Sequence, residues 1–142
     1  MDSKFFGVSF INADGSSADA GAVYSKKAIA VYFSAHWCPP CRGFTPVLTE
    51  FYNDVQSKHP DALEIIFATS DQDNEKFLDY FKSMPWKAIK FGDAKINELK
   101  SHFGVSGIPC LVVCKPDGTL ITKNGRGDVT QQGAACVETW TK

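Results

Sequence analysis

Two cysteines, Cys38 and Cys41, stand three positions apart in the segment Trp37-Cys38-Pro39-Pro40-Cys41. An apolar run precedes this segment and a helical pattern follows it, so both thiols are expected on one face of the first turn of a helix. Thiols placed this close can form a disulfide after a modest local adjustment. The pair is therefore suited to dithiol-disulfide exchange.

The two thiols are expected to have different roles because of their positions at the start of the helix. Unbonded N–H groups and the positive end of the helix dipole stabilise an anion, and Arg42 adds a positive charge nearby. Cys38, expected to be the more exposed thiol, has its pKa lowered and is the nucleophile, and Cys41 resolves the mixed disulfide. Pro39 and Pro40 lack backbone N–H groups, so this pKa is only moderately depressed and the protein is a reductant in cells.

A structural thiol pair or half of a zinc site is the alternative for these cysteines. A zinc site with four protein ligands needs a second Cys/His pair at a compatible spacing. The remaining candidates show no such spacing: His36, His59, His102, Cys110, Cys114 and Cys136. The redox interpretation is therefore favoured and no metal site is expected, and a zinc-bridged dimer built on Cys38 and Cys41 of two chains stays a third hypothesis.

The other three cysteines are interpreted one by one. Cys110 and Cys114 lie on one expected strand with Cα atoms about 13 Å apart, too far for a disulfide. Cys114 is expected to be buried, because a free Cys behaves as a small hydrophobe. Cys136 is either buried or exposed and open to oxidation or intermolecular pairing, of which burial is favoured.

The elements that position the pair follow from hydrophobic patterns. Residues 28–33 form an apolar run typical of a strand buried on both faces, and residues 63–69 form a second one. Between them, apolar residues at helical spacing predict a helix over about residues 38–58: Phe44, Val47, Leu48, Phe51 and Val55.

Further patterns complete the sheet and its covering helices. Helices are predicted over residues 75–83, around the stripe of Ile96, Leu99 and Phe103, and over residues 128–140. Hairpins are predicted at residues 110–123 and, as an N-terminal extension, from residue 5 through the turn at residues 12–15. This order predicts an α/β fold in one domain, residues 1–142, with a mixed central β-sheet flanked by helices on both faces.

Net charge and the length of the apolar runs argue against several classes of function. The chain has 142 residues, 44% of them hydrophobic, and a net charge of −1, which argues against a nucleic-acid-binding surface. Its apolar runs are far shorter than the ~20 residues of a membrane span, and polar residues interrupt the N-terminal stretch where a signal peptide needs an apolar core. We expect a soluble cytoplasmic protein without membrane contacts, and entry into the nucleus stays open.

Residues 34–46, SAHWCPPCRGFTP, resemble the active-site segment of the thioredoxin superfamily, in particular of its tryparedoxin/nucleoredoxin branch. Three further stretches match that branch: Thr69-Ser70-Asp71 with the residues up to Trp86, Gly107-Ile108-Pro109, and Gly125-Arg126. The resemblance spans about residues 28–127 and implies a thioredoxin fold. It also implies a cis peptide bond at Ile108-Pro109 facing the Cys pair.

The resemblance assigns substrate contacts as well. In the family, the backbone of the residue before the cis-proline pairs with an extended substrate segment, a contact that Ile108 makes here. Arg126 either faces the active site or is a solvated loop charge. Trp37 is expected to be partly exposed as a docking surface, with a core position as the alternative. His36 either tunes the thiols or lies on the surface.

Three positions depart from the family pattern. Tyr32 stands where thioredoxins carry a buried Asp, as it does in the tryparedoxin branch, so proton transfer to and from Cys41 needs another group, such as His36 or a bound water. Ser70 stands where tryparedoxins carry Trp, which favours the nucleoredoxin branch over recognition of the dithiol trypanothione. Cys110 follows the predicted cis-proline, where Thr is more usual, and is a third reactive thiol if it faces the site.

The sequence thus predicts a monomeric protein-disulfide reductase of tryparedoxin/nucleoredoxin type that acts in cell redox homeostasis. Its partners are disulfide-containing proteins and an upstream reductase or a low-molecular-weight dithiol. No cofactor is expected, and any NADPH dependence is indirect because no nucleotide-binding fingerprint occurs. The alternative is a redox-regulated binding module that controls a signalling partner.

Overall fold

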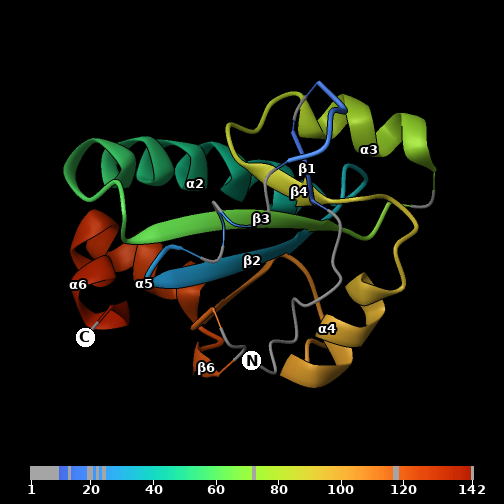
Figure 1. The fold of residues 1–142 in the computed structure, drawn as a ribbon. Helices are drawn as coiled ribbons and strands as arrows, with labels where there is room; N and C mark the ends of the chain where they lie inside the picture. The colour runs from blue at the N-terminus through green and yellow to red at the C-terminus, as the bar shows by residue number, and fades with distance from the viewer. Residues whose placement is uncertain are drawn as a thin grey trace.

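A computed structural model describes residues 10–12, 14–18, 21, 23, 25–71, 73–116 and 119–141. The strands of this part of the chain form one mixed sheet in the order β1-β4-β3-β2-β5-β6 (Figure 1). Their bounds are Phe10–Ile11 for β1, Ala28–Ser34 for β2, Leu63–Thr69 for β3, Lys87–Ile89 for β4, Cys110–Cys114 for β5 and Leu120–Thr122 for β6.

The two central strands are the ones that the apolar runs predict. β2 and β3 pair in parallel, from Ala28 opposite Leu63 to Ser34 opposite Thr69, and all residues of both strands are buried. β4 continues the sheet in parallel, whereas β1, β5 and β6 are antiparallel to their neighbours. The mixed character of the sheet is thereby confirmed.

Helices cover both faces of the sheet, as predicted. Apolar residues of α2 (Pro39–Lys58), α3 (Asn74–Phe81), α5 (Gly125–Gln132) and α6 (Cys136–Trp140) share one core cluster with alternate residues of the strands. α4 (Lys95–Phe103) packs in a second cluster on the opposite face. In Figure 1, α2 and α3 lie above the sheet and α4 lies below it.

The structure corrects two parts of the sequence interpretation. β4 was not predicted, because a three-residue strand is too short to show an alternating pattern. The single helix predicted over residues 128–140 is two α-helices, α5, which begins at Gly125, and α6, and a 3-10 helix at Gly133–Ala135 joins them. Gly133 has φ of +58° and ψ of −145°, a backbone conformation that glycine adopts at little cost.

The predicted hairpin at residues 110–123 is present, and of the predicted N-terminal hairpin the structure describes the turn and a single bridge. β5 and β6 pair in antiparallel fashion, with their connecting residues 117 and 118 outside the described residues. Near the N-terminus, Ile11 bridges Ser17 across the turn, and the N–H of Asn12 donates to the carbonyl of Ser16 over 2.9 Å. The first part of that hairpin, residues 5–9, lies outside the described residues.

Candidate active site

The two cysteines lie where β2 passes into α2. After β2 ends at Ser34, a short loop leads to Cys38, which is the N-cap of α2, and Cys41 lies in the first turn of the helix. Pro39 and Pro40 fill the first two helical positions, where a missing N–H costs nothing to the helix. The Cα atoms of Cys38 and Cys41 are 5.2 Å apart, and a disulfide joins the two side chains.

The cysteine pair is almost covered, and unequally so. Cys38 retains 5% exposure and Cys41 none, which is the order expected for an attacking and a resolving thiol. Both pack with Ala35 in a small cluster, against which Ile108 also packs. The Ile108-Pro109 bond is cis, as the resemblance implies, and the packing of Ile108 places this loop against the Cys pair.

Trp37 is the most exposed large apolar side chain among the described residues, with 58% of its surface accessible. Its indole Nε1 donates to the carbonyl of Ser70 over 3.3 Å, which ties the ring to the end of β3. An apolar ring beside Cys38 thus remains open to solvent, as expected for a docking surface.

Asp71 holds the loop that carries the cysteines. One carboxylate oxygen accepts from the backbone N–H of His36 at 2.8 Å, and the other accepts from the Thr69 hydroxyl at 2.8 Å. The side chain is 8% exposed, so both bonds are shielded from water. Sequence reasoning gave Asp71 no role of its own, although it lies in one of the stretches that match the family.

A chain of buried hydroxyl groups lies beneath Cys41. The Tyr32 hydroxyl donates to the Cys41 carbonyl at 3.1 Å and lies 2.8 Å from Thr45 Oγ1. Thr45 Oγ1 is 2.6 Å from the Tyr80 hydroxyl, which in turn is 2.8 Å from Ser34 Oγ. Burial raises the pKa of Tyr32 far above its usual value. Tyr32 therefore keeps its proton at neutral pH and acts as a hydrogen-bond donor.

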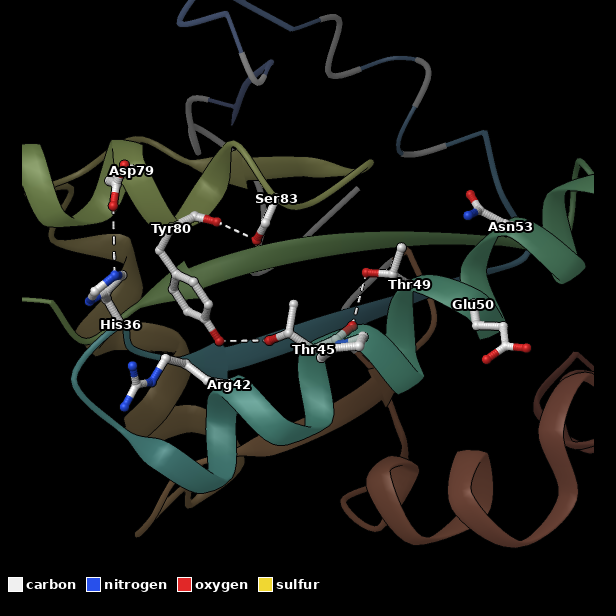
Figure 2. A pocket seen from close by; sticks show the side chains of 10 residues that line it. His36, Arg42, Thr45, Thr49, Glu50, Asn53, Asp79, Tyr80 and Ser83 are labelled. Carbon is white, nitrogen blue, oxygen red and sulfur yellow. Dashed lines mark hydrogen bonds and ion pairs between the residues drawn. The ribbon is translucent and has the colours of Figure 1, made fainter.

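His36 faces α3. Its Nε2 is 3.7 Å from Asp79 Oδ2, and its ring meets the Tyr80 ring edge-on at 5.7 Å between centroids. Figure 2 shows the imidazole directed toward Asp79 at one end of a cavity between α2 and α3. The cavity has a volume of about 630 Å³, and its other charged lining residues are Arg42 and Glu50.

A smaller hollow of about 280 Å³ has Trp37 in its lining. It lies between the cysteine loop and the cis-proline loop, and Ser70, Lys100 and Ile108 line it. The Lys100 Nζ donates to Ser70 Oγ over 3.2 Å. Sequence reasoning missed Lys100, because only the fold brings this part of α4 next to Ser70.

Cys110 and Arg126 do not belong to the cysteine cluster. Cys110 is half-buried and packs in the core cluster on the α4 face, together with Val112 and Cys114. Burial raises the pKa of the Cys110 thiol, an effect that the charges of Lys123 and Arg126 oppose. Arg126 is exposed, and its guanidinium carbon lies 5.9 Å from the centre of the Phe44 ring in α2.

The remaining cysteines are buried, as favoured from the sequence. Cys114 is fully covered and Cys136 is 1% exposed. Burial raises the pKa of the Cys136 thiol to about 12, with the charge of Asp128 adding to the rise. Within the described ranges, no three His, Cys, Asp or Glu side chains are grouped to hold a metal ion. None of the helices described there is long and apolar enough to span a membrane.

The chain is similar to known redox proteins. A thioredoxin-like family model matches residues 26–120. Probable nucleoredoxin 1 of Arabidopsis thaliana is 47% identical over 108 residues, which cover 76% of this chain and 18% of that protein. Tryparedoxin of Trypanosoma brucei brucei is 42% identical over 109 residues, which cover 74% of this chain and 73% of that protein. Thus the chain spans less than a fifth of that nucleoredoxin.

Solved structures confirm that the fold is a thioredoxin fold. Thioredoxin from Wuchereria bancrofti superposes with a TM-score of 0.80 and 42% identity over 94% of this chain and 93% of that chain. Tryparedoxin II, solved in complex with glutathionylspermidine, gives a TM-score of 0.86 and 32% identity over 98% of this chain and 97% of that chain.

Proposed function

Because the chain belongs to the thioredoxin-like family, with nucleoredoxins and tryparedoxins among its homologues, we propose that it reduces protein disulfides through Cys38 and Cys41. The observation that carries the proposal is the unequal exposure of the two thiols at the start of α2. Such a pair has one sulfur that a substrate reaches and a second that is held within bonding distance.

The reaction consists of two exchanges at sulfur. The Cys38 thiolate attacks one sulfur of the substrate disulfide, so that a Cys38-substrate bond forms and the first substrate sulfur leaves as a thiolate that takes up a proton. The Cys41 thiolate then attacks Cys38 Sγ, and the second substrate thiolate leaves. The substrate gains two electrons and the protein ends with the Cys38-Cys41 disulfide.

The surroundings of the pair support this division of roles. The start of α2 stabilises the Cys38 thiolate, whereas Pro39 and Pro40 offer it no N–H groups, so the thiolate forms without becoming a poor nucleophile. Tyr32 fixes the backbone of Cys41 but is too weak an acid to exchange its proton near neutral pH. His36 or a water molecule is then the carrier for the proton of Cys41.

Substrate binding is assigned to the rim of the pair. The backbone of Ile108 pairs with an extended segment of the substrate, and Trp37 offers its exposed ring to the same segment. Arg126 lies farther out, over Phe44, where it reaches the more distant part of a protein substrate.

The electron donor is an upstream reductase or a low-molecular-weight dithiol, with no bound cofactor. The complex of tryparedoxin II with glutathionylspermidine supports a small thiol in this role. We place the reaction in the cytoplasm, because a reductant acts where thiols are kept reduced.

The test is multiple-turnover reduction of a protein disulfide with a chemical dithiol as donor. Cys38→Ser is expected to abolish turnover, and Cys41→Ser is expected to accumulate a mixed disulfide on Cys38, because the resolving thiol is gone. Cys114→Ser is the matched control, since that thiol is buried away from the pair. Turnover that survives Cys38→Ser contradicts the proposal.

A redox-regulated binding module is the second candidate, favoured by the 58% exposure of Trp37 beside the pair. Such a module binds its partner through this surface, and Cys38→Ser leaves that binding intact. Loss of partner capture in the same variant supports the reductase.

A further inference from the structure

The hollow beside the cis-proline loop contains one charged group, the ammonium of Lys100. Lys100 lies in the last turn of α4, on the face of the sheet opposite α2. Its side chain is half-buried and enters the space between Trp37 and Ile108, which belong to the two loops that frame the cysteine pair.

The Lys100 ammonium has hydrogen-bonding capacity to spare. It carries three N–H donors, of which one is used by Ser70 Oγ at 3.2 Å. Among the described residues, no carboxylate lies within ion-pair distance of it, whereas Lys95 on the same helix is paired with Glu98. The nearest acid in sequence to Ser70 is Asp71, which is occupied by His36 and Thr69.

The surroundings keep the hollow open and positive. Ser70 is a small residue, and at Gly107 even an added Cβ would meet no atom within 4 Å. The charges of Lys123 and Arg126 act on Cys110, the residue after Pro109, so their positive potential reaches the neighbourhood of the cis-proline. The chain as a whole has a net charge of −1, so this local excess of cations is not a general property of its surface.

We propose that this hollow receives a carboxylate side chain of the substrate, so that the protein prefers disulfides with Asp or Glu beside the attacked cysteine. The inference rests on the proposed function and specifies its substrate class. A segment that pairs with the Ile108 backbone presents alternate side chains to one side. A carboxylate at this position accepts a hydrogen bond from Lys100 Nζ, whose orientation is fixed by its hydrogen bond to Ser70. Lys100 is thus a specificity-determining residue.

The experiment uses three short peptides with one intramolecular disulfide, identical except for Glu, Gln or Lys beside one cysteine. Pre-reduced protein is mixed with each peptide, and the reduced peptide is quantified after acid quenching, which gives a second-order rate constant without any electron donor. We expect the Glu peptide to react about three-fold faster than the Gln peptide, and the Lys peptide to be slowest. Raising the salt to about 0.5 M is expected to reduce these differences.

Variants separate charge recognition from folding. Lys100→Gln is expected to react with all three peptides at similar rates, and Lys100→Glu to prefer the Lys peptide. Lys95→Gln, on the same helix but outside the hollow, is expected to keep the wild-type order. Ser70→Trp fills the hollow and is expected to slow the Glu peptide to the rate of the Gln peptide.

Two results overturn the inference while the proposed function stands. These are equal rates of the wild type with all three peptides, or an unchanged Glu preference in Lys100→Gln. If none of the peptides is reduced by the wild-type protein, the proposed function itself fails, and the inference fails with it.

Discussion

The hydroxyl of Tyr32 donates a hydrogen bond to the backbone carbonyl of Cys41, the second cysteine of the pair, across 3.1 Å. The same hydroxyl lies 2.8 Å from Thr45 Oγ1, which also donates to the Cys41 carbonyl at 2.9 Å. Two side chains thus hold the first turn of α2 from below. The position of Cys41 depends on this buried network as well as on the helix itself.

Removing the Tyr32 hydroxyl is therefore expected to affect both stability and reactivity. Tyr32→Phe leaves Thr45 with one partner fewer in a buried site and is expected to lower the free energy of unfolding by about 1–2 kcal/mol. It is also expected to slow the release of the mixed disulfide by Cys41. The control is Tyr52→Phe, which removes a buried hydroxyl bonded to Glu64, away from the cysteines. Equal reactivity of the two variants would show that Tyr32 does not position Cys41.

Asp71 is expected to be essential for the geometry of the cysteine loop. Asp71→Ala removes the acceptor for the His36 N–H and the Thr69 hydroxyl, and is expected to cost about 2–3 kcal/mol of stability and to slow disulfide reduction. Asp54→Ala is the matched control, because its side chain is 45% exposed and its pairing with Lys58, near the far end of α2, contributes little. Urea unfolding and the rate of disulfide reduction, measured for both variants, test whether Asp71 maintains the geometry of the cysteine loop. An Asp71→Ala protein that reduces disulfides at the wild-type rate contradicts this role.

Features that depend on neighbouring residues could be predicted from the sequence, whereas contacts between residues far apart in the sequence could not. β2, β3 and α2 were predictable because each carries its own pattern, an apolar run or a stripe at helical spacing. The cysteine pair was predictable because its chemistry lies within four residues. The bond from Asp71 to His36 joins residues 35 apart, and that from Lys100 to Ser70 joins residues 30 apart. No local pattern encodes such contacts, since they arise only when the sheet is assembled.

Gly125 is expected to tolerate no side chain. A Cβ there would lie 2.8 Å from the carbonyl oxygen of Leu111 in β5, a backbone atom that has no room to move. Gly125→Ala is therefore expected to destabilise the protein by about 2 kcal/mol or more. Gly43→Ala in α2 is the control, because its Cβ would meet no atom within 4 Å, and alanine is expected to stabilise the helix by about 0.5–1 kcal/mol. Thermal unfolding tests both expectations: the midpoint should fall for Gly125→Ala and rise for Gly43→Ala.

Stability is expected to fall in alkaline solution. Burial raises the pKa of the Cys136 thiol from 9.0 to about 12, so the folded protein retains a proton that the unfolded chain releases. The protonated Cys136 thiol makes its full contribution to the free energy of unfolding below about pH 9. This contribution is lost as the pH rises toward 12, because unfolding then releases the proton. Cys136→Ala is expected to make the decline between about pH 9 and 11 less steep. Urea unfolding under reducing conditions measures the free energy of unfolding of both proteins at each pH. If this free energy falls equally steeply with pH in the wild type and in Cys136→Ala, the decline does not come from Cys136.

Trp37 is expected to contribute to substrate binding and little to folding. Trp37→Ala removes a ring that is 58% exposed, so its effect on the free energy of unfolding is expected to stay within about 0.5 kcal/mol. The value of kcat/KM for a protein disulfide is expected to fall about ten-fold, mainly through KM. Leu120→Ala, which shortens another exposed apolar side chain, serves as the control. A loss for Trp37→Ala no larger than that for Leu120→Ala contradicts a docking role.

The central claim is that Cys38 and Cys41 form a reducing redox couple, and the reduction potential of that couple tests it most directly. Equilibration with glutathione buffers, followed by thiol counting in the wild type and in Cys38→Ser, gives this value. The account predicts a two-electron couple between about −270 and −200 mV in the wild type, the range of thioredoxin and the glutaredoxins, and none in Cys38→Ser. A potential near about −120 mV, typical of an oxidant, or the absence of a two-electron couple would contradict it.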